Sequence, residues 1–174
     1  MLKIGLEQIT DADRRRLVTY ILELLRSFLG DDLISVVVFG SVARGRADLN
    51  SDTDVILVAS NMPRSLSERM EILANLLVEF SKTQTCEELN RKGLNTWVQF
   101  HPLTMEEAEL HRPIYLDVVE DGIIVYDRGG FIKRVMEGFK SKLEALGAKR
   151  IFLEDGSWYW DLKPSIKRGE VVEV

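Results

Sequence analysis

The spacing of apolar residues predicts a helix and then two buried strands in the first part of the chain. Between residues 13 and 29, apolar side chains recur at helical spacing, at Leu17, Ile21, Leu24, Leu25 and Phe28. This is the pattern of an amphipathic helix, which Asp11 can cap and Gly30 ends. Continuous apolar runs over 33–39 and 53–59 then indicate buried strands, joined by a glycine-containing connection.

Helix and strand signals continue to alternate along the rest of the chain. Ser65 and Glu68 have the spacing of a capping box, and Thr104 and Glu107 repeat it. Pro102 is expected to close the strand between them. The pattern predicts helices over 65–80, 113–120 and 131–146, a short helix after 104, strands over 95–101 and 123–126, a hairpin of 150–154 with 158–162, and an extended tail from 163. This alternation favours layered α/β architecture and leaves open whether the sheet is parallel or mixed.

Composition limits the class of protein. Hydrophobic residues make up 45% of the 174 residues and charged residues 29%, which argues against disorder. The net charge of -5 speaks against general nucleic-acid binding. The single Cys86 allows no intrachain disulfide. No apolar run is long enough for a membrane span and no signal peptide is evident, so we expect a cytoplasmic protein. The charge-rich composition hints at a thermophilic source.

Two carboxylates lie where the second buried strand begins. Asp52 and Asp54 share one strand face, because side chains alternate along a strand. Carboxylate oxygens suit Mg²⁺, which binds through one or two carboxylates together with substrate phosphates. Two charges at the mouth of a buried strand are costly unless they are paired or bind a metal. Taken alone, the same residues also fit an ordinary solvated turn.

A glycine and a serine directly follow the first predicted strand. Gly40 lets backbone N–H groups approach an anion closely. Ser41 is expected to cap a short helix that starts at Val42, and such a helix end favours phosphate. Arg44 and Arg46 either add positive charge near a triphosphate or are solvated loop residues, and the sequence favours neither interpretation.

Together these features resemble the minimal nucleotidyltransferases of the DNA polymerase β superfamily. That family has a strand, then Gly-Ser, then Asp-x-Asp at the start of the next strand. The residues that match it are Gly40, Ser41, Arg44, Ser51, Asp52 and Asp54. The resemblance is tight over this segment and looser to about residue 105. The resemblance of the last segment, which contains Trp158 and Trp160, to archaeal members is less specific.

The resemblance implies a fold, a reaction and a site. The fold would be a mixed β-sheet flanked by helices, with a nucleotidyltransferase core over 1–105 and a helical and hairpin extension over 106–174 packed on it. The reaction would transfer a nucleoside monophosphate from a Mg²⁺-bound triphosphate, with ATP expected, to an acceptor hydroxyl. The nucleotide would be held by Gly40, Ser41, Arg44 and Ser51, and the metal by the catalytic carboxylates Asp52 and Asp54.

One position departs from the family pattern. A third carboxylate is expected on a later strand, and here that position holds Gln99. A neutral amide is a poor ligand for a hard cation and cannot act as a general base. The group that could fill this role instead is His101 on the same strand face, or Glu87 or Glu88 in the loop expected before the strand.

Three hypotheses follow. The first is an active nucleotidyltransferase. The second is a catalytically weakened nucleotide-binding module, such as the antitoxin-like partner of a small helical protein, which the loss of a third acid favours. The third is a coincidental motif in a structural protein. Trp158 and Trp160 would either stack a base or, as the simpler interpretation, cover the core.

Overall fold

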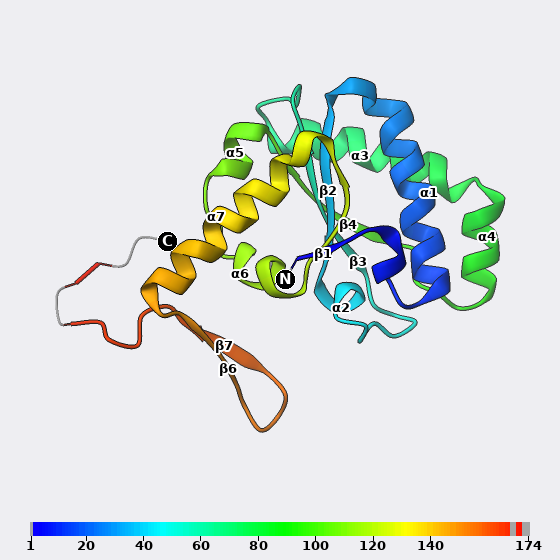
Figure 1. Ribbon diagram of the computed structural model, residues 1–174. Coiled ribbons are helices and arrows are strands. Elements are labelled where there is room, and N and C mark those ends of the chain that lie inside the picture. The colour runs from blue at the N-terminus through cyan, green and yellow to red at the C-terminus, as the bar shows by residue number, and fades with distance from the viewer. Residues whose placement is uncertain (1, 168–169, 172–174) are drawn as a thin grey trace.

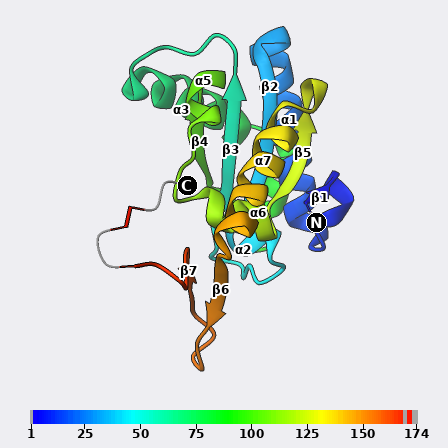
Figure 2. The ribbon, with the colours of Figure 1, turned by 60° about the vertical axis from the view of Figure 1, so that its left-hand side comes forward.

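The protein is built around a five-stranded sheet with helices on both faces and a separate two-stranded hairpin (Figures 1 and 2). The computed structural model describes residues 2–167 and 170–171. The strands are β1 (Lys3–Ile4), β2 (Leu33–Phe39), β3 (Thr53–Ala59), β4 (Val98–Leu103), β5 (Ile123–Asp127), β6 (Lys149–Phe152) and β7 (Trp158–Asp161). The helices are α1 (Ala12–Leu29), α2 (Gly40–Ala43), α3 (Leu66–Ser81), α4 (Gln84–Arg91), α5 (Met105–Glu109), α6 (Tyr115–Asp121) and α7 (Phe131–Leu146).

The sheet is mixed, as the family resemblance implied. Its strand order is β1-β5-β2-β3-β4. β2 is antiparallel to both β3 and β5, whereas β3 and β4 are parallel, as are β1 and β5. The fold class predicted from the sequence is therefore confirmed. The antiparallel pairing of β2 with β3 places the end of β2 beside the start of β3, where the Gly-Ser and Asp-x-Asp segments lie.

Apolar side chains fill both faces of the sheet. On one face the core is formed with α1, α3 and α4, and on the other with α5, α6 and α7 (Figure 1). Every residue of β2 is buried, which matches the continuous apolar run seen in the sequence. Burial on both sides makes the central strands a rigid support for whatever their ends carry.

Several elements differ from the sequence prediction. Helix α4 was expected to be a loop, and β1 was not predicted. Pro102 does not close its strand, because β4 continues to Leu103. A proline is tolerated there because β4 is an edge strand that pairs only with β3. The predicted capping box forms in full at Thr104 and Glu107, whereas at α3 the structure shows one half of it, a hydrogen bond from the Glu68 backbone to the Ser65 side chain.

The last described segment forms the predicted hairpin. Strand β6 pairs with β7, and Arg150 faces Trp160 across the pair. Trp160 and Leu162 pack against the α5–α7 side of the core, so the prediction that this tail covers the core is confirmed for these two residues. Strand β5, from beyond residue 105, lies inside the central sheet. The division of the chain near that residue remains a prediction.

Candidate active site

The close approach of Gly40 to Asp54 joins the two sequence motifs. Phe39, the last residue of β2, is the register partner of Asp54 on β3. Gly40 follows with a φ of 69°, and a Cβ added there would lie 2.2 Å from Asp54 Oδ2. The position therefore requires glycine for two reasons: its φ is positive, and the Asp54 carboxylate occupies the space that a Cβ would need.

Ser41 lies in the first turn of α2 and does not cap it. The helix begins at Gly40, and Phe39 occupies the N-cap position without a side-chain hydrogen bond. The expectation that Ser41 caps a helix starting at Val42 is therefore wrong. The Ser41 hydroxyl makes no hydrogen bond within the described part of the chain, while its carbonyl accepts one from the Arg46 backbone at 2.9 Å. This contact closes a turn over residues 41–46.

The two acids have different environments. Asp52 is exposed, and its Oδ1 accepts a hydrogen bond from Asn95 Nδ2 at 2.7 Å. Asp54 is half-buried, and burial raises its pKa above the ordinary value. The negative charge of Asp52 adds to the rise in that pKa, whereas His101 and Arg44 act against it. A half-buried carboxylate beside a second one is a site at which a bound cation would relieve an existing electrostatic cost.

The loop that precedes the acids is held by a buried arginine. The Arg14 guanidinium, 1% exposed, donates to the carbonyl oxygens of Asn95 and Asp48, each at 2.8 Å, and to the Thr53 hydroxyl at 3.3 Å. Ser51 completes the loop, because its hydroxyl donates to Asp48 Oδ1 at 3.0 Å. Ser51 thus has a structural partner, and its role at a nucleotide remains a prediction.

Gln99 lies beside Asp54, where the third acid was expected. It is the register partner of Asp54 on β4, and His101 lies two residues further on, opposite Ile56. The His101 ring packs edge-on against Phe39 with centroids 5.3 Å apart, and burial lowers its pKa. Over residues 2–167 and 170–171, no three His, Cys, Asp or Glu side chains are grouped to hold a metal.

Glu87 and Glu88 do not take the place of a third acid. Both lie on α4, where Glu88 pairs with Arg16 at 2.6 Å and Glu87 with Arg91 at 3.1 Å. The alternative that one of them fills the third position is thus not supported. Of the groups considered from the sequence, His101 is the one that the structure brings close enough to act on Asp54.

Arg44 links the site to the C-terminal hairpin. Its guanidinium carbon lies 4.9 Å from the centroid of the Trp158 ring. Arg150 also lies over that ring, at 4.2 Å, and the Trp158 indole donates to Asp117 Oδ1 at 3.0 Å. Arg44 is therefore held in a defined place, and it is close enough to lower the pKa of Asp54. Arg46, by contrast, is exposed.

Two residues of this site escaped the sequence analysis. Asn95, the hydrogen-bond partner of Asp52, was assigned to a strand and lies just before β4. Arg14 was not singled out, although it lies three residues before Leu17 on the buried face of α1. That spacing was the available signal, since residues three apart on a helix share a face.

The donor set fits Mg²⁺. Asp52 and Asp54 supply hard oxygen ligands from neighbouring positions, and Gly40 leaves room for one carboxylate oxygen of Asp54. The raised pKa of Asp54 indicates that this charge is not fully compensated by the protein itself. The neutral Gln99 limits the protein ligands at this place to the two carboxylates.

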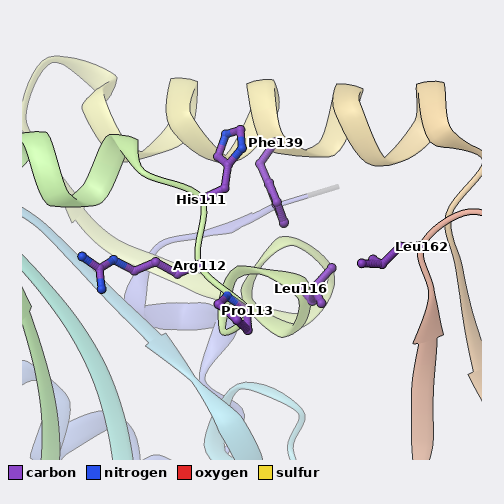
Figure 3. Close-up of a pocket in the computed structure, with 6 residues that line it drawn as sticks. All are labelled: His111, Arg112, Pro113, Leu116, Phe139 and Leu162. Carbon is purple, nitrogen blue, oxygen red and sulfur yellow. The ribbon is translucent and has the colours of Figure 1, made fainter. Parts of the chain in front are cut away.

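A second concavity lies apart from this site. It has a volume of about 270 Å³ and is lined by His111, Arg112, Pro113, Leu116, Phe139 and Leu162 (Figure 3). Its lining is mostly apolar and it contains no carboxylate. We therefore place the candidate chemistry at the Gly40–Asp54 contact.

None of the helices in the described segments is long and apolar enough to cross a membrane.

Comparisons with known proteins show the family of this chain. The model of the nucleotidyltransferase domain family matches residues 18–159, and the chain belongs to this family. A curated relative, "Putative protein adenylyltransferase" of Methanocaldococcus jannaschii, is 30% identical over 138 residues, covering 77% of this chain and 84% of the relative.

Solved structures include similar chains at low identity. One belongs to a toxin–antitoxin crystal structure with AMP-PNP, with 16% identity, a TM-score of 0.46, and coverage of 74% of this chain and 91% of that chain. Another is a putative nucleotidyltransferase from Sulfolobus solfataricus, with 20% identity, a TM-score of 0.43, and coverage of 70% and 88%.

Proposed function

We propose that this protein transfers AMP from Mg²⁺-bound ATP to a hydroxyl group of an acceptor. Family membership supports the transfer of a nucleoside monophosphate. The name of the Methanocaldococcus jannaschii relative supports adenylate as the group and a protein as the acceptor. The observation that carries the proposal is the contact of Gly40 with Asp54, because it brings the Gly-Ser turn and the acid pair into one site.

Each site residue has a role in this proposal. Asp52 and Asp54 would hold Mg²⁺, which would supply positive charge to the phosphates and to the leaving pyrophosphate. Gly40 and Ser41 lie against the phosphates, where the free Ser41 hydroxyl can donate. Arg44 adds a positive charge, and Ser51 contributes through the loop that it closes with Asp48.

The chemistry is a displacement at the α-phosphorus. The acceptor oxygen forms a bond to phosphorus, the bond to the bridging oxygen breaks, and pyrophosphate leaves with the electron pair. The acceptor proton passes to water or to a nearby base. Gln99 cannot take that proton, so we expect slow transfer unless His101 does.

The catalytically weakened partner module is the less favoured alternative. The half-buried charge of Asp54 is a costly feature that binding a metal and nucleotide would explain. A small helical protein is nevertheless the first acceptor that we would test, since it agrees with both hypotheses. A cytoplasmic location and a thermophilic source remain predictions.

The test is a glycine-to-alanine pair assayed with ATP labelled at the α-phosphate. Gly40→Ala would drive a Cβ into Asp54, whereas Gly147→Ala adds the same atom at a similar φ of 70° with no atom within 4 Å. We expect Gly40→Ala to lose Mg²⁺-dependent ATP binding by calorimetry and label transfer, and Gly147→Ala to keep both. Equal ATP binding and label transfer by the two variants, or ATP binding that does not depend on Mg²⁺, would contradict the proposal.

A further inference from the structure

A cleft opens along β4, next to Gln99. We call it the β4 cleft. Its volume is about 410 Å³, and its lining comes from β4, the start of α3 and the region of α5. The residues that line it are Arg64, Leu66, Arg69, Met70, Gln99, Phe100, His101, Pro102, Leu103, Glu107 and Arg112. Since Gln99 is the register partner of Asp54, one end of the cleft lies beside the proposed metal ligands.

The β4 cleft carries two unpaired positive charges. Its one carboxylate, Glu107, forms a fork with Arg69, whose Nη2 donates to Glu107 Oε1 at 3.1 Å and whose Nη1 bonds the other oxygen. Arg64 and Arg112 form no ion pair with any residue that the structure describes. The net charge of the lining is therefore positive, because Arg64 and Arg112 are added to a neutralised pair.

Neither free arginine is committed to the core. Arg64 is exposed and precedes Ser65, the N-cap of α3. Arg112 uses its Nε to donate to the Glu107 carbonyl at 3.2 Å, which leaves its terminal nitrogens available. Its side chain points away from Phe139 and Leu162 (Figure 3). Both guanidinium groups have the fork geometry that binds a carboxylate through two hydrogen bonds.

The order of the strands shows which residues lie on each side of Asp54. Gly40 and Ser41 lie on the β2 side of β3, whereas Gln99 and the cleft lie on the β4 side. In phosphoryl transfer the attacking and leaving oxygens lie roughly in line on opposite sides of the phosphorus. If the phosphates lie against Gly40 and Ser41, the attacking hydroxyl approaches from the side of β4.

We infer that the β4 cleft is the acceptor subsite and that it selects hydroxyl-bearing side chains in acidic peptide segments. The inference rests on the proposed transfer function. The hydroxyl lies at the Gln99 end, its oxygen bonds to the α-phosphorus as pyrophosphate leaves, and its proton passes to water. Neighbouring carboxylates of the peptide bind Arg64 and Arg112, while its apolar atoms contact Leu66 and Met70.

The cleft suits a peptide side chain better than a nucleic acid or an added strand. A nucleic acid requires a basic track along many phosphates, whereas the whole chain has a net charge of -5 and the cleft offers only two free cations. An added β-strand would need the free edge of β4. Pro102 has no N–H there, and its carbonyl already accepts from Arg69 at 3.3 Å.

Peptide binding by fluorescence anisotropy tests the inference without depending on turnover. The probes are a labelled peptide with one hydroxyl residue flanked by Glu and Asp, its Gln/Asn and Lys analogues, and an oligoribonucleotide. We expect the acidic peptide to bind about tenfold tighter than the neutral one, and the difference to shrink as salt rises. Arg64→Ala and Arg112→Ala should each weaken acidic-peptide binding about three- to tenfold.

Two further variants make the result decisive. Arg64→Glu should lower the preference for the acidic peptide more than Arg64→Ala does and should raise binding of the Lys peptide. Arg91→Ala removes an exposed arginine of α4 outside the cleft and should change nothing. Equal binding of acidic and neutral peptides, no effect of the cleft variants, or equally tight binding of the oligoribonucleotide would overturn the inference. Calorimetry with Mg²⁺ and ATP on the same samples decides the proposed function separately.

Discussion

Asp54 and Gln99 are register partners on the parallel strands β3 and β4, so their side chains leave the sheet on the same face. The position beside the half-buried acid is therefore occupied by a neutral amide. In a reaction that develops negative charge at two oxygens, the missing third carboxylate limits metal binding and the activation of the acceptor hydroxyl.

Gln99→Asp should increase nucleotidyl transfer. The new carboxylate would add a hard oxygen ligand next to Asp54 and a group able to take the acceptor proton. We expect ATP binding to be nearly unchanged, Mg²⁺ affinity to rise, and the transfer rate or slow ATP hydrolysis to increase by about tenfold or more. The measurement is the initial rate with α-labelled ATP at several Mg²⁺ concentrations.

Gln99→Asn is the matched control, since it changes the side-chain length and keeps the amide. It should stay as slow as the natural protein. A different result, with the natural protein already fast and Gln99→Asp slower, would mean that another group serves the third position. His101 would then be the first residue to replace, because burial lowers its pKa and it is close enough to Asp54 for the charge of that carboxylate to act on it.

Asp54→Asn should stabilise the metal-free fold while abolishing Mg²⁺-dependent ATP binding. Burial and the charge of Asp52 raise the pKa of Asp54, so its ionised form costs folding free energy near neutral pH. The amide removes that cost, and we expect the melting temperature at pH 7 to rise by about 2 °C or more. Asp52 is exposed, so Asp52→Asn should weaken ATP binding without a comparable rise in the melting temperature.

The pH dependence of this gain has a definite sign. An acid whose pKa is higher in the folded state destabilises the fold at pH values above that pKa, and the penalty vanishes below the unfolded pKa of about 3.9. The difference in melting temperature between Asp54→Asn and the natural protein should be largest near pH 7 and close to zero near pH 3.5. A difference that is constant with pH would show that the charge of Asp54 is not its cause.

Arg14→Met should destabilise the protein by about 2–4 kcal/mol, because it removes the buried guanidinium that donates to two backbone carbonyl groups. The acceptors are the backbone oxygens of Asn95 and Asp48, which fix the loop before Asp52. Transfer should therefore fall as well. Arg16→Met on the same helix removes an exposed ion pair with Glu88 and should cost at most about 1 kcal/mol. Urea unfolding that gave equal losses would refute a structural role for Arg14.

The central strands could be predicted closely because their apolar runs are unambiguous. β2 and β3 occupy the predicted residues, since both are buried on both faces. Helix α4 was missed because its buried residues are only Cys86 and Leu89, too few for a periodic signal. Strand β1 has only two residues and forms through pairing with β5, a contact that no local pattern encodes.

The acid pair and the glycine could be predicted because the motif is contiguous in sequence. The β4 cleft could not, because Arg64 and Arg112 come from distant segments and share a surface only after α3 and α5 pack on the sheet. The contact of Arg44 with Trp158 could not be predicted for the same reason. Trp158 lies more than a hundred residues away, in a hairpin that the sequence predicted either to cover the core or to stack a base.

Trp158 holds Arg44 near the candidate site through its ring face. The guanidinium carbon of Arg44 lies 4.9 Å from the ring centroid, and the indole N–H is fixed by Asp117 at 3.0 Å. A contact of this kind contributes about 0.5–2 kcal/mol. The contact restricts the Arg44 side chain to one region. Arg44 therefore loses less side-chain entropy when a triphosphate binds to it.

Trp158→Ala should therefore weaken Mg²⁺-dependent ATP binding by about three- to tenfold, because Arg44 would lose its support. Trp158→Phe keeps an aromatic face and loses the hydrogen bond to Asp117, so its ATP affinity should lie between those of the natural protein and Trp158→Ala. Tyr159→Ala changes the neighbouring exposed residue of β7 and serves as the control. The measurement is calorimetry with ATP and Mg²⁺, with each variant's melting curve as a check on folding. Tighter ATP binding by Trp158→Ala would reverse the argument: the tryptophan would then hold Arg44 away from the phosphates, and the hairpin would restrain the site rather than support it.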